Sequence, residues 1–200
     1  MAGNGVCSTG GFGVKIIQYT VFLVVGLLAG CASAPHQPKS STTLGDLSDS
    51  GIVVIGQSVH GLSRGLPQIS WADKAGDLRG ELRMVGDPST MQVVSTLDYK
   101  NGALHVLQLP AGEYAFTGWY VDLGRSGLGY VEKEGHLDYQ FDVLPGQAVY
   151  LGTFEMRMEM PARVKDAQIA VTLEDDFYRD RAEFFKRYPK IESLEHQVME

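Results

Sequence analysis

The sequence predicts a mainly β protein: a single antiparallel β-sandwich with one or two C-terminal α-helices, after an export signal and a flexible tether. Apolar segments of strand length recur along residues 51–174, and Gly, Pro and Asn turn signals separate them about every eight to fifteen residues, as in sandwiches and barrels. Helical periodicity is confined to residues 175–200. A length of 200 residues suits one domain, and 44% hydrophobic with 20% charged residues is a globular composition.

Residues 1–30 have the organisation of a secretory signal peptide. Their one charged residue, Lys15, precedes an apolar stretch. From Tyr19 to Leu28 this stretch is about ten residues long, whereas a helix that spans a membrane needs about twenty. The length therefore favours a signal-peptide core, and the alternative is an uncleaved membrane anchor.

The apolar stretch ends in the residues LAGC, at positions 28–31. These residues resemble the lipobox of bacterial lipoproteins, in which an aliphatic residue and two small residues precede the lipidated cysteine. The resemblance implies cleavage between Gly30 and Cys31, and attachment of S-diacylglycerol and an N-acyl chain to Cys31. Two or three acyl chains hold a protein on a membrane, whereas a single chain binds reversibly. The alternative for Cys31 is a buried or free thiol.

Ala32 and Cys7 extend this expectation. In that family an Asp after the lipidated cysteine usually retains the protein in the inner membrane, so Ala32 implies an outer-membrane lipoprotein that faces the periplasm. Cys7 is the only other cysteine and would leave with the signal peptide. The mature chain would then have no disulfide, no thiol nucleophile and no cysteine metal site.

Residues 31–50 are rich in Ser and also contain Pro, Thr, Asp and one Gly. Leu44 and Leu47 are the only large apolar residues there, too few to offset the entropy cost of ordering the segment. The composition predicts a flexible, lipidated tether. Twenty coil residues would extend about 25 Å.

The sandwich is expected over residues 51–174. Residues 51–59 form a compact apolar strand, and an alternating segment at 80–86 places Leu82 and Met84 on one face. Asn101-Gly102 is a hairpin signal, because both residues tolerate positive φ. Further strands are expected within residues 91–99, 103–109, 109–122, 137–160 and 162–173.

The C-terminal segment, residues 175–200, differs in period. Phe177, Phe184 and Tyr188 fall at i, i+7 and i+11, which is one face of a helix over about residues 174–189. Acids at its start and bases at its end suit the helix dipole, and Pro189 ends it. Three apolar residues then predict a second short amphipathic turn: Ile191, Leu194 and Val198.

Two turns carry a second resemblance. Leu109-Pro110 with Gly112, and Leu144-Pro145-Gly146, each lead into a strand that contains Tyr. They resemble turns of prealbumin-like sandwiches of the carboxypeptidase-regulatory type, and of small envelope lipoproteins of unknown function whose C-terminal helix ends near Arg187-Tyr188-Pro189. The resemblance implies a prealbumin- or immunoglobulin-like fold and an envelope location, and it implies no catalytic residues.

Few residues suggest metal chemistry. The chain has five histidines: His36, His60, His105, His136 and His196. No two of them have the close sequence spacing of a metal-binding pair. Met156, Met158 and Met160 alternate on a strand about 6.6 Å apart. Thioethers suit Cu(I), so a periplasmic copper-binding lipoprotein is one alternative. Core packing explains the same pattern, because Met fills irregular gaps.

Signals for an enzyme are also few. The glycines of residues 124–129 have the wrong spacing for a nucleotide-binding loop and predict a mobile hairpin loop. Ser58, near His60, and Ser95 lack the turn of a serine hydrolase. Four carboxylates near the loop leave an envelope hydrolase as the less favoured alternative: Asp122, Glu132, Glu134 and Asp138.

Aromatic residues beside the loop form a candidate binding surface: Trp119, Tyr120 and Tyr130, with Tyr139 nearby. Alternation puts Trp119 and Tyr120 on opposite faces, so one belongs to the core and the other is exposed. An exposed aromatic side chain beside acids suits a glycan or a peptide.

The sequence therefore predicts a lipid-anchored, non-enzymatic module for binding or accessory roles, with no cofactor and no metal. The membrane is reached through Cys31, and an envelope protein or peptidoglycan is the expected partner. Nucleic acid is not expected, because 24 acidic residues outnumber 17 basic ones and the net charge is −7.

Overall fold

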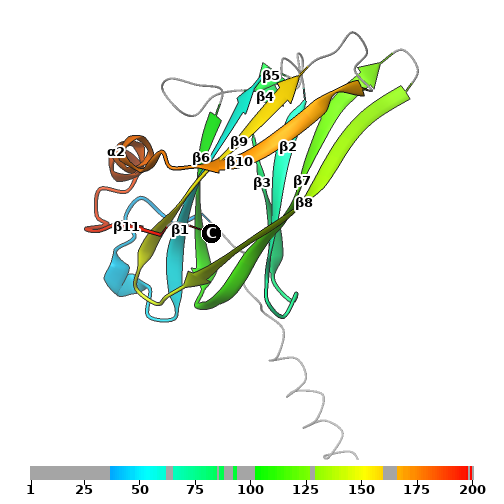
Figure 1. Cartoon of the computed structure of the whole chain (residues 1–200). Helices are drawn as coiled ribbons and strands as arrows, with labels where there is room; N and C mark the ends of the chain where they lie inside the picture. Colours follow the sequence, from blue (N-terminus) through cyan, green and yellow to red (C-terminus); the bar gives the residue numbers. More distant parts are fainter. Residues whose placement is uncertain are drawn as a thin grey trace, which may run out of the picture. The chain divides into compact units, whose positions relative to one another are not determined.

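A computed structural model of the chain describes residues 37–61, 65–84, 86–87, 92–93, 102–126, 129–159, 166–197 and 199. Gly30 and Cys31 lie outside these residues, as do the signal segment and the Asn101 of the predicted Asn-Gly turn. The described residues form two facing sheets and one α-helix (Figure 1). The prediction of a mainly β sandwich with a C-terminal helix is confirmed.

The first sheet has the strand order β10-β9-β1-β6, with the short β11 beside β9. Its strands are β1 (Ser50–His60), β6 (Gly102–Pro110), β9 (Ala148–Glu159), β10 (Gln168–Glu174) and β11 (Glu195–His196). β1 pairs antiparallel with β6 but parallel with β9. The sandwich is therefore not purely antiparallel, because these two central strands are far apart in the chain and no hairpin joins them.

The second sheet has the order β3-β2-β7-β8 and is antiparallel throughout. Its strands are β2 (Leu66–Asp73), β3 (Arg79–Arg83), β7 (Gly112–Ser126) and β8 (Gly129–Val143). A small ribbon joins β4 (Gly86–Asp87) to β5 (Gln92–Val93). The predicted loop at residues 124–129 is mostly strand, because β7 and β8 pair as far as Ser126 and Gly129.

The main core lies between the two sheets. Phe116 of β7 stacks on Phe141 of β8, and its ring meets the edge of Phe154 of β9; both centroid distances are 4.9 Å. Leu82 of β3 and Met84, directly after it, are buried in the same core, which confirms the predicted placing of these two residues on one face.

A second core lies on the outer face of the first sheet, under the helix α2 (Phe177–Arg187). β1 contributes to both cores: Val53 and Ile55 face the second sheet, whereas Ile52 and Val54 face α2. A strand that is buried on both faces has no polar side to alternate with, which explains the continuous apolar run of β1.

Residues 37–49 differ from the predicted flexible tether, because they lie against the domain. Leu47 is 1% exposed in the core under α2, directly after the short 3-10 helix η1 (Leu44–Asp46). Gln37 Nε2 donates a hydrogen bond to the Tyr188 hydroxyl at 3.1 Å. The segment has few apolar side chains, but one of them, Leu47, reaches the apolar face of the first sheet, and composition alone does not show this.

The second predicted amphipathic turn is not a helix. Ile191 and Leu194 are buried as expected, but residues 191–194 form no regular helix or strand, and a turn precedes them. β11 pairs with β9, and the backbone N–H of Gln197 donates to the carbonyl oxygen of Tyr150 at 3.0 Å. Two apolar residues three positions apart are too short a signal to establish a helix, and the edge of β9 offers backbone hydrogen bonds to a short strand instead.

Candidate binding face

The outer face of the second sheet is a polar face that the described elements leave uncovered. The helix α2 packs on the first sheet, on the side away from β2, β3, β7 and β8 (Figure 1). Along β8, exposed and inward-facing residues alternate as in a half-buried strand. Its exposed residues include Glu132, Glu134, His136 and Asp138.

The predicted aromatic surface contains Tyr120 but not Trp119. Trp119 packs against the core between the sheets and lies over Gly135, where a Cβ atom would come within 2.4 Å of the Trp119 Nε1 atom. Tyr120 lies on the opposite face, opposite Glu134 in the sheet register. Partial burial, and a hydrogen bond to Glu132, raise the pKa of Tyr120. The backbone of Tyr130 belongs to β8, and its side chain lies outside what the structure describes.

The four candidate carboxylates line the same face without facing one another across a cleft. Asp122 and Glu132 are neighbours on adjacent strands, and Glu134 and Asp138 are exposed further along β8. Asp122 Oδ1 accepts a hydrogen bond from the backbone N–H of Gly124 at 2.7 Å, which gives it a local structural role. An acid–base pair needs two carboxylates on either side of a substrate, and this arrangement does not provide it.

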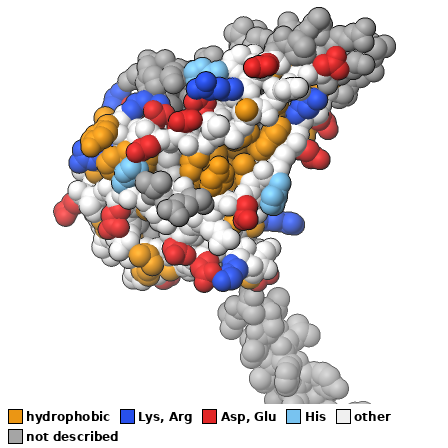
Figure 2. All heavy atoms as spheres, viewed as in Figure 1, with side chains coloured by type: hydrophobic (Ala, Val, Ile, Leu, Met, Phe, Trp, Pro, Cys, Tyr) orange, Lys and Arg blue, Asp and Glu red, His pale blue; other side chains and the backbone are white. Residues whose placement is uncertain are grey.

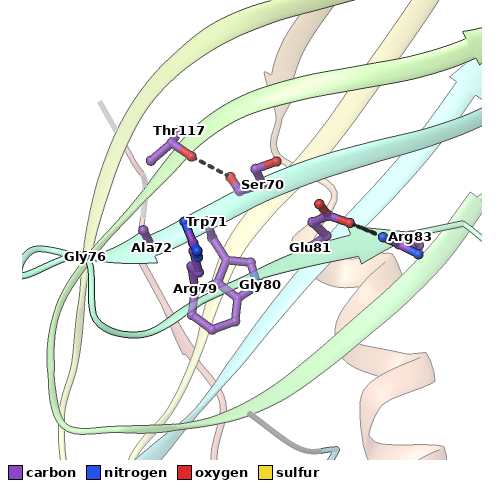
Figure 3. A pocket seen from close by; sticks show the side chains of 9 residues that line it. All are labelled: Ser70, Trp71, Ala72, Gly76, Arg79, Gly80, Glu81, Arg83 and Thr117. Atoms are coloured by element: carbon purple, nitrogen blue, oxygen red, sulfur yellow. Dashed lines mark hydrogen bonds and ion pairs between the residues drawn. The ribbon is translucent and has the colours of Figure 1, made fainter. Parts of the chain in front are cut away.

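A groove of about 710 Å³ lies at the β2–β3 side of the second sheet (Figure 3). Its lining consists of Ser70, Trp71, Ala72, Gly76, Arg79, Gly80, Glu81, Arg83 and Thr117. Trp71 and Gly80 are direct neighbours across the two strands. A Cβ atom on Gly80 would lie 2.6 Å from the Trp71 ring, so glycine at this position lets the indole lie across β3.

Some polar groups of the groove already form hydrogen bonds within its lining. Arg83 Nε donates to Glu81 Oε2 at 2.8 Å, and the Thr117 hydroxyl donates to the Ser70 carbonyl oxygen at 3.5 Å (Figure 3). Within the described part of the chain, the Arg79 guanidinium has no hydrogen bond or ion pair. A free guanidinium beside hydroxyl groups is suited to a ligand that carries carboxylates.

The methionines belong to the core. Met156 and Met158 are 3% and 8% exposed and pack between the sheets, and Met160 lies outside the described residues. This supports the core-packing explanation of their alternation. The described residues contain no group of three His, Cys, Asp or Glu side chains that could hold a metal ion.

The histidines and serines are dispersed. His60 Nε2 lies 2.8 Å from Glu155, and His196 Nε2 lies 3.1 Å from Asp175. His105 Nε2 is 3.0 Å from Gln57 Oε1 inside the sandwich, and burial, with a smaller effect of the Arg187 charge, lowers its pKa to about 4. Ser58 is buried, so it is not available to a substrate. His36 and Ser95 lie outside the described residues, and His136 is exposed.

Sequence reasoning missed a buried polar cluster under α2, made of Tyr150, Thr153, Arg179 and Asp180. Asp180 is fully buried and accepts hydrogen bonds from the Tyr150 hydroxyl, the Thr153 hydroxyl and Arg179 Nε, at 2.8, 2.8 and 2.7 Å. Burial, and then the charge of Asp180, raise the pKa of Tyr150 well above its usual range. Burial lowers the pKa of Arg179, which the charge of Asp180 opposes.

This cluster fixes α2 to the sheet, and its position was readable from the helix pattern. Asp180 lies three residues after Phe177 and four before Phe184, on the same helical face. A charged residue on an apolar face needs buried partners, which is a signal for such a cluster.

No family model and no curated protein matches the chain. Among solved structures, a leucine-rich repeat protein from Bacteroides thetaiotaomicron VPI-5482 gives a TM-score of 0.30 at 17% identity. That match covers 58% of this chain and 14% of the other protein, so this chain spans a small part of its length. Among the described residues, no helix is long and apolar enough to span a membrane.

Proposed function

We propose that this chain is a lipid-anchored, non-enzymatic binding module on the periplasmic face of the outer membrane. The anchor is Cys31, by its lipobox-like context at residues 28–31. Anionic headgroups repel an acidic domain, so charge cannot attach this protein to the membrane. The diacylglycerol and the N-acyl chain would provide the attachment instead.

The observation that carries the binding role is the β2–β3 groove on a face that no described element covers. Arg79 offers a guanidinium without a partner among the described residues, and the groove lining includes Ser70 and Thr117. These groups suit a hydroxyl-rich ligand with carboxylates, and peptidoglycan is the envelope polymer with that chemistry. The buried Met156 and Met158 give no support to copper binding.

The anchor is tested by expressing the full chain and Cys31→Ser in a Gram-negative host. We expect the wild-type protein in the outer-membrane fraction, with the mass of a triacylated chain beginning at Cys31. We expect Cys31→Ser to lose both the lipid mass and the outer-membrane fractionation. A wild-type protein with an intact Met1 contradicts the proposed anchor.

The groove is tested by co-sedimentation of the detergent-purified protein with peptidoglycan sacculi. Arg79→Ala should weaken binding about tenfold, as expected for loss of one charged anchor. Lys190→Ala, an exposed site near η1, is the matched control and should bind like wild type. Equal binding of all three proteins contradicts the groove assignment.

A further inference from the structure

Among the described strands, β10 forms an edge of the first sheet. It pairs with β9 from Gln168 to Glu174, and no described strand pairs with its other side. Its side chains alternate: Ile169, Val171 and Leu173 are half-buried against the core between the sheets, and the residues between them are exposed.

β10 lacks the features that usually protect an edge. Proteins protect edge strands with Lys, Pro or a bulge. The seven residues of β10 contain no Lys, Arg or Pro, and the register with β9 has no shift. β3, an edge of the second sheet, differs because it exposes Arg79, Glu81 and Arg83.

An apolar patch accompanies this edge. Figure 2 shows hydrophobic side chains gathered along β10. Leu173 is the neighbour of Phe154 in β9, and the ring of Phe154 meets that of Tyr139 of β8 at 5.7 Å. A strand added to β10 would place every second side chain beside Ile169, Val171 and Leu173 and would cover them.

We propose that the β10 edge accepts an extended segment of a partner protein, as an added strand in which apolar and basic side chains alternate. The charges around the edge favour basic residues. Glu174 ends β10 and Asp175 follows it, the exposed Glu159 of β9 lies opposite Gln168, and the chain as a whole carries −7. The one basic neighbour in the β9 register, Arg157, is paired with Glu155. Main-chain hydrogen bonds would provide affinity, and the apolar strip and the carboxylates would provide specificity.

A second copy of the chain fits this edge less well. Antiparallel pairing of two β10 strands about Val171 would bring Gln168 of one copy opposite Glu174 of the other, and β10 carries no Lys or Arg that could pair with this carboxylate. The inference deepens the proposed binding role by naming a protein partner, but it uses a different surface from the groove.

The test uses the full chain in detergent and a fluorescent nine-residue peptide in which Val and Lys alternate. Binding is measured by fluorescence anisotropy. A peptide of the same composition with its Val and Lys residues in two blocks is the peptide control. We expect binding of the alternating peptide, and at least about tenfold weaker binding of the block peptide.

Variants then locate the site. Val171→Lys should weaken binding about tenfold or more, since it introduces an inward-pointing charge, and Val171→Thr should weaken it about threefold while keeping the strand shape. Thr172→Gln, on the opposite face, should bind like wild type. Circular dichroism checks that each variant is folded, and Val171→Thr keeps the test decisive if Val171→Lys does not fold.

Three results overturn the inference: equal binding of both peptides, binding unaffected by Val171→Thr, or a dimer that Val171→Lys dissociates while the alternating peptide does not bind. Arg79→Ala and Cys31→Ser should leave peptide binding unchanged. A negative result in the peptide experiment would therefore contradict the β10 inference and leave the proposals for the lipid anchor and the groove untouched. Negative results for the anchor or the groove would likewise leave the β10 inference untouched.

Discussion

Gly56→Ala tests whether the buried cluster holds α2 on the sheet. An added Cβ atom on Gly56 would lie 2.2 Å from Thr153 Oγ1 and 2.7 Å from Asp180 Oδ2. Neither position is compatible with a Cβ contact, so Thr153 or α2 has to move. Movement of either one disrupts the 2.8 Å hydrogen bond between Thr153 and Asp180.

The expected cost follows from two contributions. Overpacking a tight site costs about 1–3 kcal/mol. Loss of a partner for a buried carboxylate costs about another 1–3 kcal/mol. We therefore expect Gly56→Ala to lower the free energy of unfolding by about 2–6 kcal/mol, and to lower the Tm by about 5–20 °C for a domain of this size.

The assay is a double-mutant cycle followed by urea denaturation. Thr153→Ala removes the oxygen that the new methyl group would meet, so Gly56→Ala should cost about 1–2 kcal/mol less in that background. Gly112→Ala is the matched control, because Gly112 is an exposed strand glycine whose Cβ would have only an ordinary contact, 3.6 Å from Tyr114. A cost below about 1 kcal/mol for Gly56→Ala, with no coupling to Thr153, refutes the reasoning.

Three further predictions concern His105, Leu47 and Met156. The pKa of His105 is lowered from 6.5 in the unfolded chain to about 4 in the folded state, so folding favours the neutral imidazole. The resulting contribution to the free energy of unfolding is fully present above pH 6.5. This contribution, about 3 kcal/mol at most, is lost as the pH falls from 6.5 towards 4, and urea titrations should show a smaller loss over that range in His105→Gln. Leu47→Ala should destabilise the domain by about 2–4 kcal/mol in the same assay, whereas a residue of a flexible tether would cost nothing measurable. Met156→Leu should change stability by less than about 1.5 kcal/mol and should leave Cu(I) binding, measured with a chelator competition, no different from wild type; a loss of Cu(I) binding would revive the copper site.

The strands could be predicted from the sequence where burial on one face produced alternation. Leu82 in β3 and Met84 directly after it show this, and the continuous apolar run of β1 reflects burial on both faces. β2 was missed, although Ile69 and Trp71 alternate there with Gln68 and Ser70. The signal was short, and it ended in a turn region where the β2–β3 register begins.

The candidate site was less predictable from the sequence, because it depends on which strands pair with one another. The β2–β3 groove needs Thr117 of β7 beside Ser70 of β2, and these residues are 47 positions apart. Trp119 was correctly separated from Tyr120 by alternation, but which of them faced the core depended on the other sheet. The buried cluster brings Thr153 to Asp180 across 27 positions, and only the helix spacing of Asp180 pointed to it.

Because residues 37–49 pack against the domain, the proposed lipid anchor would hold the domain closer to the membrane than a flexible segment over residues 31–50 would. If only the residues between Cys31 and Gln37 connect the lipid to the domain, their fully extended length is about 20 Å, compared with the longer coil expected for residues 31–50. An acidic domain on so short a connection stays close to headgroups that repel it, so its attachment depends on the acyl chains rather than on charge. A basic partner strand at β10 would reduce that repulsion as it binds, because it would neutralise carboxylates of the same domain. The affinity for such a partner should therefore be higher on vesicles that contain anionic lipids than in neutral detergent.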